Sequence, residues 1–388
     1  MNTNKLIAVA FVAALLTLAF GAWATPAEAY TNNGHRWYGN PTFKVAPNMG
    51  SQTTCSEFSS VSWRNDFNCS VAAWNNLAAS YLTIYHTTND ENDTDHGDLE
   101  NEVAWDDTMS GSTLGLAWTF ALWGELYESD ITFNPYPSTG APWVSGAPPP
   151  SAWHYNWYNM VAFRPVALHE LGHAQGLGHY NYEAAIMNSY YPFGGWYRGQ
   201  NTAGFNSYYG RHWPHADDVQ GAQAIYSNTA VGRDLTILRA KTGYTSGGAV
   251  NGSAVDLAPV KPNGRTDITT ICPGGYLDIE YTVENRGNEI VTPMVWAYLS
   301  TNLWITPSDI PVNGKAHALA PYEAEFVQHR FYMPSSIPAG TYYVGVFVDP
   351  DNDITGEQSE DYNNGVDLYV GTSPNQLLTV LPSGGSCP

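Results

Sequence analysis

The chain has 388 residues, and its 15 basic residues against 36 acidic ones give a formal net charge of −21 at pH 7. A protein this acidic is poorly suited to nucleic acid or to an anionic membrane surface, so the sequence predicts neither partner. The length predicts two domains, and we expect a monomer.

Residues 1–29 have the pattern of a secretory signal peptide. Lys5 precedes an apolar run over residues 6–20, and small residues follow, with candidate cleavage sites at Ala24 and Ala29. A membrane anchor is the alternative, but the run is short for a bilayer span, and we expect no span after signal removal. The sequence therefore predicts a secreted, extracellular protein whose mature chain begins near Tyr30.

Four cysteines fit an exported protein. Cys55 and Cys69 lie close together in the sequence, whereas Cys272 and Cys387 lie in the second half. Four cysteines allow three pairings. We expect Cys55–Cys69 and Cys272–Cys387, because each bond then lies within one domain. A cysteine zinc site is the rival interpretation, but the chain has no C-x-x-C pair.

The first domain, residues 30–228, mixes helix and strand patterns. Apolar residues recur at helical spacing after Ser70, which predicts an amphipathic helix over residues 71–81 with Ser70 as its N-cap. Residues 81–86 follow as a strand. The segment 134–158, with six prolines, either shapes a cleft or merely connects elements at the surface. A second helix is expected to begin near Pro165.

That second helix carries the pattern H-E-x-x-H-x-x-G-x-x-H over residues 169–179. Because residues four apart share one helical face, His169 and His173 can bind the same metal. Gly176 can take the backbone conformation that ends the helix and lets the chain return with His179. Zinc held by three neutral histidines keeps a position for water and lowers its pKa. Glu170 can then take the proton and pass it to the leaving amine, so the pattern predicts one catalytic zinc and peptide-bond hydrolysis rather than a chance match.

A methionine extends this pattern to a family. Met187 stands eight residues after His179, and the long histidine motif followed by such a Met-turn resembles the metzincins. The eight-residue interval is similar to that of the matrixin (matrix-metalloproteinase type) branch. The resemblance covers residues 35–228 and implies that Met187 forms a hydrophobic floor under the zinc. It also implies that Tyr191 lines the S1′ specificity pocket.

The same resemblance extends upstream and downstream of the motif. Residues 114–120 resemble the family's edge strand, in which Gly115, Leu116 and Ala117 would align an extended protein or peptide substrate by main-chain pairing. Residues 217–226 resemble its closing helix. Trp118 stands where animal members place a histidine that binds a structural zinc, so we expect a single zinc here.

The second domain, residues 229–375, has the pattern of an antiparallel β-sandwich, followed by a tail over residues 376–388. Short alternating runs, separated by Gly, Pro and Asn, occupy residues 276–283, 294–300, 326–332, 342–348 and 366–370. Residues 283–287, 340–344, 348–353 and 360–364 resemble the bacterial CARDB module, an immunoglobulin-like domain. That resemblance implies binding to a surface or matrix ligand, or spacing, rather than chemistry.

Two acidic clusters make calcium a further candidate cofactor. Asp349, Asp351, Asp353 and Glu360 have EF-hand spacing, but Ile354 replaces the glycine that such a loop requires. The second cluster consists of the aspartates of residues 90–98. Matrixin-like domains often bind structural calcium, whereas a solvated turn is the alternative for both clusters.

The expected fold is an α+β metzincin catalytic domain plus an all-β immunoglobulin-like sandwich. The catalytic domain would have a twisted sheet with an edge strand over the cleft and a zinc-bearing helix. The expected function is that of a secreted zinc endopeptidase. The alternative is an adhesion or binding protein whose C-terminal sandwich is the main functional part.

Overall fold

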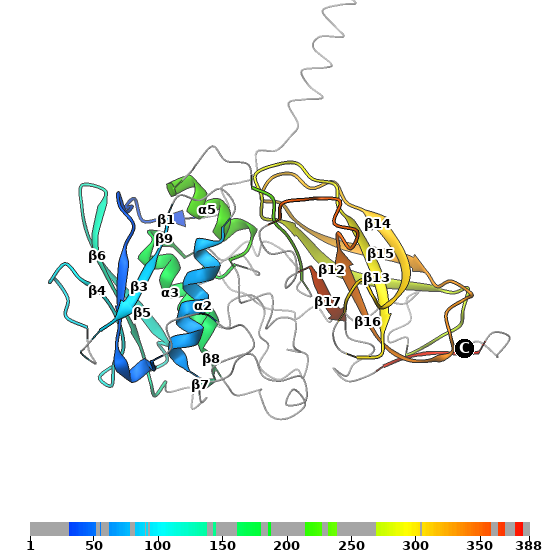
Figure 1. Ribbon diagram of the computed structural model, residues 1–388, viewed down its shortest axis with the longest axis horizontal. Coiled ribbons are helices and arrows are strands. Elements are labelled where there is room, and N and C mark those ends of the chain that lie inside the picture. Colours follow the sequence, from blue (N-terminus) through cyan, green and yellow to red (C-terminus); the bar gives the residue numbers. More distant parts are fainter. Residues whose placement is uncertain are drawn as a thin grey trace, which may run out of the picture.

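The computed structural model describes residues 31–51, 55, 62–77, 82–89, 91, 94–137, 143–144, 161–179, 185–187, 214–226, 232–238, 269–302, 305–357, 364–368 and 377–382. These residues form two bodies that lie side by side (Figure 1), one with helices and a sheet and one built of strands. The predicted signal peptide lies outside the described residues. No helix among the described residues is long and apolar enough to cross a bilayer.

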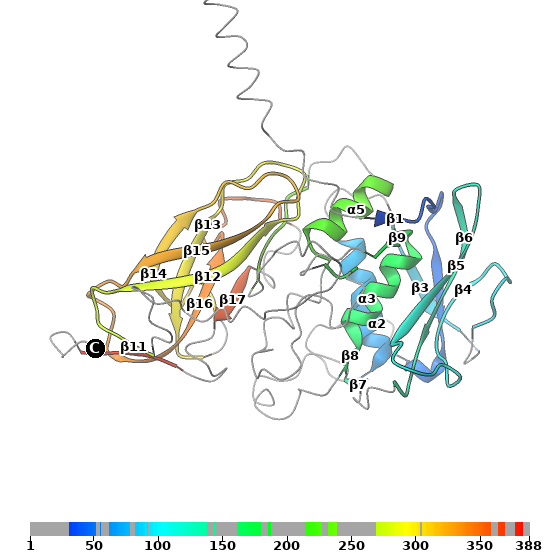
Figure 2. The ribbon, with the colours of Figure 1, turned by 180° about the vertical axis from the view of Figure 1, so that it is seen from behind.

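The first body is a five-stranded sheet with helices packed against it, as Figure 2 shows from behind. The strand order is β3 (Tyr85–Thr88), β2 (Thr42–Val45), β4 (Asn101–Trp105), β6 (Glu125–Phe133) and β5 (Gly115–Leu122). All neighbours are parallel except β5, which pairs antiparallel with β6 and lies at the edge. Apolar side chains of this sheet share one buried core with the helices α2 (Trp63–Asn75), α3 (Phe163–Ala174) and α5 (Ala216–Tyr226).

Short elements complete this body. The strand β1 (Thr31–Asn32) pairs antiparallel with β9 (Leu177–Gly178), and β7 (Trp143–Val144) pairs parallel with β8 (Val161–Ala162). A 3₁₀ turn, η1 (Pro47–Met49), follows β2. Pairing with β1 fixes the position of the chain directly after α3, where the third predicted metal ligand lies.

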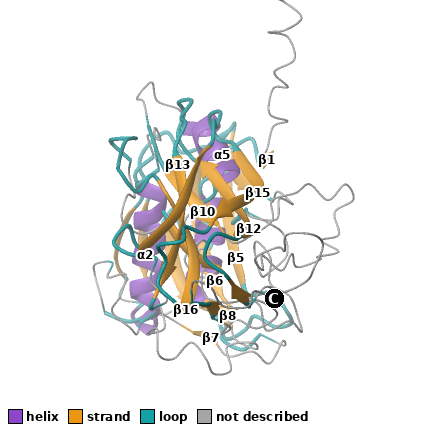
Figure 3. Cartoon of the chain, turned by 90° about the vertical axis from the view of Figure 1, so that its right-hand side faces the viewer, coloured by secondary structure: helices purple, strands orange, loops and turns teal. Residues whose placement is uncertain are grey.

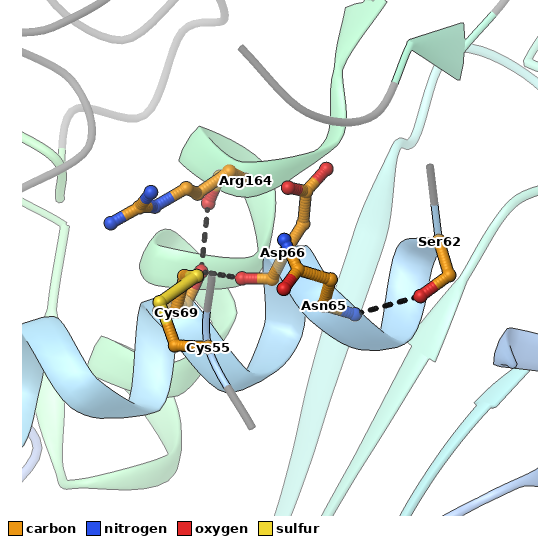
Figure 4. Close-up of a disulfide and its surroundings, with 7 residues drawn as sticks. Cys55, Ser62, Asn65, Asp66, Cys69 and Arg164 are labelled. Carbon is orange, nitrogen blue, oxygen red and sulfur yellow. Dashed lines mark hydrogen bonds between the residues drawn. A yellow bond between two sulfur atoms is a disulfide. The ribbon is translucent and has the colours of Figure 1, made fainter. Parts of the chain in front are cut away.

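The helix α2 corrects two sequence predictions. Its N-cap is Ser62, whose side chain accepts a hydrogen bond from the Asn65 amide (Figure 4). Ser70 lies inside the helix, where its hydroxyl donates to the Asp66 carbonyl, so the prediction that Ser70 begins the helix was wrong. The strand predicted at residues 81–86 is displaced as well, since β3 begins at Tyr85. The apolar periodicity did not reveal the true start of the helix, because the first turns of α2 bury polar side chains.

A disulfide ties α2 to the segment that precedes it. Cys69, on α2, is bonded to Cys55 (Figure 4), and the two are 14 residues apart in the sequence. Cys272 is also disulfide-bonded. Its predicted partner, Cys387, lies outside the described residues.

The second body consists of two sheets around one core. One sheet has the order β10 (Leu235–Leu238), β12 (Tyr276–Asn285), β15 (Ala324–Tyr332). The other has the order β11 (Thr270–Ile271), β18 (Leu378–Val380), β16 (Gly340–Val348), β13 (Met294–Ser300), β14 (Ile310–Ala316), with β17 (Gly365–Leu368) also paired to β16. Buried side chains of both sheets form one cluster, and Figure 3 shows these strands in front of the helices of the first body. The five predicted runs correspond to β12, β13, β15, β16 and β17, whereas β10, β11, β14 and β18 were not predicted.

Candidate functional site

The helix α3 and the turn after it carry the histidine motif. His169 and His173 lie one turn apart on α3, as their spacing predicts. The helix ends before Gly176, which has a φ of +99°, and a Cβ there would lie 2.3 Å from the carbonyl oxygen of His35. Only glycine therefore suits this turn. Directly after β9, the chain returns with His179.

The three histidines converge through their Nε2 atoms. The Nε2 atom of His169 lies 3.1 Å from that of His173 and 3.1 Å from that of His179. The His173 and His179 Nε2 atoms are 3.0 Å apart. Two nitrogens about 2.05 Å from one tetrahedral metal are about 3.3 Å apart, so this spacing suits zinc. Among the described residues, these three side chains form the one group with the geometry of a metal site.

Backbone carbonyls set the tautomers of two of these histidines. Nδ1 of His169 lies 2.7 Å from the Ile186 carbonyl oxygen, and Nδ1 of His173 lies 2.9 Å from that of Leu177. A carbonyl can only accept, so each Nδ1 carries the proton and each Nε2 keeps its lone pair. Burial lowers the pKa of His169 well below its usual value and that of His173 to about 4, which keeps both rings neutral. Lone pairs that face one another repel unless a cation lies between them, so the donor set fits a metal ion.

Glu170 lies on α3, and its side chain faces the edge strand β5. Burial raises the pKa of this carboxyl to about 8, and a hydrogen bond with the Ala117 backbone lowers it in part. A Cβ on Gly115 would lie 2.8 Å from Glu170 Oε1, so β5 passes directly over the carboxyl group. A bound dication would lower this pKa further. The predicted substrate-aligning residues Gly115, Leu116 and Ala117 thus lie beside the predicted base, and Leu116 is 51% exposed.

Met187 packs beneath α3. Its side chain is buried, and a Cβ on Gly172 would lie 2.2 Å from its sulfur. Trp74 of α2 supports the same helix from another side, since its Nε1 donates to the Leu168 carbonyl at 3.0 Å. The predicted S1′ residue, Tyr191, lies outside the described residues.

One important residue was missed by the sequence analysis. The buried carboxylate of Asp218, in the first turn of α5, accepts hydrogen bonds from the amides of Ile186, Met187 and His215 at 2.8, 3.0 and 2.9 Å. It therefore fixes the Met-turn, residues 185–187. Burial raises the pKa of Asp218, while His215 and these amides oppose the rise. The acidic pair at the start of the predicted closing helix was the signal that could have identified this role.

One of the calcium candidates, Asp349, has other partners. Asp349 Oδ1 and Oδ2 accept hydrogen bonds from the Asp353 and Ile354 amides, so this carboxylate closes its own turn. Glu360, from the same cluster, lies outside the described residues, as do Asp90 and Asp93 from the other.

Trp118, which the sequence analysis places at a position where animal members have a histidine, stacks on His96. The ring centroids of Trp118 and His96 are 4.8 Å apart, and Nδ1 of His96 lies 2.8 Å from Asp130 Oδ2. The edge strand therefore presents an aromatic side chain at this point, and the adjacent imidazole bonds a buried carboxyl group.

Comparison with known proteins supports the catalytic part of this description. Residues 85–227 match the model of the matrixin family, Peptidase_M10. Matrix metalloproteinase-19 of Mus musculus is 38% identical over 74 residues, which is 19% of this chain and 11% of that protein's length.

Solved structures similar to the chain include CARDB domains. A crystal structure of a Pyrococcus furiosus CARDB domain in complex with di-metal ions is 16% identical, with 40% of this chain and all of that one covered, at a TM-score of 0.22. A solution structure of the same domain is 17% identical, with 37% of this chain and all of that one covered, at a TM-score of 0.22. Residues 85–227 are thus similar to matrixin domains, and the chain spans about a tenth of the length of the matrix metalloproteinase that it matches.

Proposed function

We propose that the chain is a secreted, zinc-dependent endopeptidase. The observation that carries this proposal is the convergence of the His169, His173 and His179 Nε2 atoms beside the buried Glu170 carboxyl group. The three histidines hold one zinc ion, and calcium is not needed for the chemistry. The catalytic unit, residues 30–228, has the metzincin type of fold. Residues 229–375 form a CARDB-like, immunoglobulin-type sandwich, followed by a tail, and the enzyme is monomeric.

Glu170 carries the proton transfers. When bound, zinc supplies a Lewis acid that polarises the scissile carbonyl and lowers the pKa of water. The Glu170 carboxylate takes a proton from the attacking water and delivers it to the leaving amine. The Ala117 backbone, which hydrogen-bonds this carboxylate, holds it toward the substrate side of the site. Met187 maintains the packing under the ligand-bearing helix.

The edge strand β5 binds the substrate. Within the described residues it pairs with β6 alone, so its other edge, apart from the Ala117 group that bonds Glu170, can pair with an extended peptide. Gly115, Leu116 and Ala117 would contact the residues next to the scissile bond, because β5 passes over Glu170 at this end. Tyr191 would line the S1′ pocket. This arrangement favours unfolded or extended protein segments as substrates.

Cleavage of casein by the signal-free chain tests the proposal. We expect cleavage that a zinc chelator abolishes and that added zinc restores. Glu170→Ala should still bind one zinc per chain but lose roughly 10²–10⁴-fold in rate, because it removes the general base. Glu125→Ala, which removes a carboxylate from the far end of β6, serves as the matched control and should cleave normally. Near-normal cleavage by Glu170→Ala would refute the mechanism.

A further inference from the structure

The end of β12 and the residue that follows it contact the segment just before α5 through two buried side chains. Glu284 is fully buried, and its Oε2 lies 3.0 Å from Nδ1 of His215, which is 3% exposed. Arg286 donates from Nη1 to the carbonyl of Pro214 at 3.1 Å and from Nη2 to Asp234 Oδ1 at 2.7 Å. Two side chains of the second body, here called the β-domain, thus hold the residues that immediately precede α5.

These residues are connected to the metal-binding histidines by a continuous path of hydrogen bonds. The amide of His215 donates to the Asp218 carboxylate, which also accepts from the amides of Ile186 and Met187. The carbonyl of Ile186 in turn accepts from Nδ1 of His169. Displacement of His215 would therefore shift the group that orients the His169 ring.

The electrostatics of this contact argue against a packing role alone. Besides Glu284, the carboxyl groups of Asp217 and Asp218 are buried here, and Glu284 contributes to raising the pKa of Asp217. The Oε1 atom of Glu284 has no hydrogen-bond partner among the described residues. Burying a carboxylate beside other acids is costly, and an apolar side chain of similar size would pack at lower cost. The presence of Glu284 at this buried position is therefore better explained by its specific bond to His215.

A second contact joins the same elements. Tyr322, in the turn before β15, packs against the core of the catalytic domain, and its hydroxyl donates to the Gln223 side chain on α5. Tyr322 has a φ of +57°, a conformation that L side chains rarely adopt and that costs about 1 kcal/mol or more. A strained backbone conformation thus occurs at a residue that contacts α5.

We propose that the C-terminal β-domain is a positioning part of the catalytic centre, with Glu284 acting through His215 and Asp218 to hold the Met-turn and the His169 ring. The inference rests on the proposed zinc site and adds a function for the second domain within the same molecule. Glu284 is a positioning residue, because it contacts neither metal nor substrate. Its effect is on how firmly the ligand set is held.

Two measurements on the full chain test this role. The first is hydrogen exchange of the Ile186 and Met187 amides in the metal-free protein. The second is the rate at which the zinc-loaded protein loses zinc to a chromogenic chelator. Removing an outer partner that contacts a metal ligand directly costs roughly 10–100-fold in affinity. Because Glu284 acts through intermediate residues, we expect Glu284→Leu to accelerate zinc loss about 3- to 10-fold and to speed exchange of both amides at least as much.

The controls separate positioning from general destabilisation. Glu284→Gln keeps an oxygen that can accept a hydrogen bond from His215. In this variant the rates of zinc loss and of amide exchange should therefore lie close to those of the wild type. Tyr281→Phe removes hydroxyl contacts to His317 and His329 from the same strand, away from α5, and should leave both rates unchanged. If Glu284→Leu does not fold, Glu284→Asp, which withdraws the carboxylate by one methylene, replaces it with the same expected direction.

Two outcomes would overturn the proposal. One is wild-type exchange of the Ile186 and Met187 amides together with wild-type zinc loss in the Glu284 variant. The other is equal acceleration by Tyr281→Phe, which would mean that any weakening of the β-domain suffices. Failure of the wild-type chain to bind zinc would refute the proposed function instead, while exchange in the metal-free protein would still decide whether the coupling exists.

Discussion

A methyl group added at Gly172 tests how tightly Met187 packs under the metal-binding helix. The new Cβ would lie 2.2 Å from the Met187 sulfur and 3.2 Å from Trp74 Cζ2, and both neighbours are buried with little room to move. Alanine gains about 1 kcal/mol over glycine in a helix interior. Overpacking a buried site costs about 1–3 kcal/mol, and so close an approach favours the upper end. We therefore expect Gly172→Ala to lower the free energy of unfolding by about 2 kcal/mol.

The same substitution should have the opposite sign when Met187 is truncated. In a Met187→Ala chain the methyl group meets no sulfur, so Gly172→Ala should stabilise by about 1 kcal/mol through helix propensity. The coupling between the two sites is then about 3 kcal/mol, near the upper end for residues in contact. Urea unfolding of metal-free chains, all carrying Glu170→Ala to prevent self-cleavage, measures all four variants. Equal effects of Gly172→Ala in both backgrounds would refute the close packing of Met187 on α3.

Three further predictions concern stability. Paired serine substitutions at Cys55 and Cys69 should lower the free energy of unfolding by about 3 kcal/mol, because the disulfide joins residues 14 apart in the sequence. Thermal unfolding of the oxidised proteins measures this loss. An unchanged melting temperature would contradict the prediction. Ser62→Ala should lower the free energy of unfolding by about 1 kcal/mol because it removes the N-cap of α2, whereas Ser62→Thr keeps the acceptor and should lower it little. Equal losses of the two variants in urea unfolding would argue against the cap. Burial, with nearby acids, raises the pKa of Glu357 from 4.5 to about 8, so its stabilising contribution is complete below pH 4.5 and is lost as pH rises to about 8. Glu357→Gln should therefore gain stability relative to the wild type between about pH 5 and pH 9, by roughly 3–5 kcal/mol, and a difference that does not change with pH would contradict the shift.

The convergence of the three histidines was predictable because their geometry is local. Spacing on one helix brings His169 and His173 together, and a glycine turn returns His179, so three positions in a short segment determine the site. The groups that orient the rings were not predictable. They are the carbonyls of Ile186 and Leu177, and every residue has a carbonyl, so no side chain in the sequence marks the two that accept these bonds.

The start of α2 illustrates a second limit. Its first turns bury Arg64, which donates from Nη1 to the Val45 carbonyl and from Nη2 to that of Thr87. A buried guanidinium that bonds strand carbonyls looks like a surface residue in a hydrophobicity pattern, so the helix was placed too late in the chain. The short parallel strands are difficult for a related reason. Their partners lie far away in the sequence, and four or five residues carry too little periodicity to distinguish strand from loop.

The proposed boundary at residue 228 shows the same limit at the level of domains. Helical periodicity ends there, but contacts continue across it, since Tyr322 packs against the core that includes Val219 and Tyr226. A chain ending at residue 228 would expose this part of α5 to water and leave His215 without Glu284. Such a fragment would retain the complete histidine motif but lose the partners that fix α5 and, through Asp218, the Met-turn. The sequence thus places the histidine motif in the first half of the chain, whereas the contacts of α5 and of the residues just before it extend into the second.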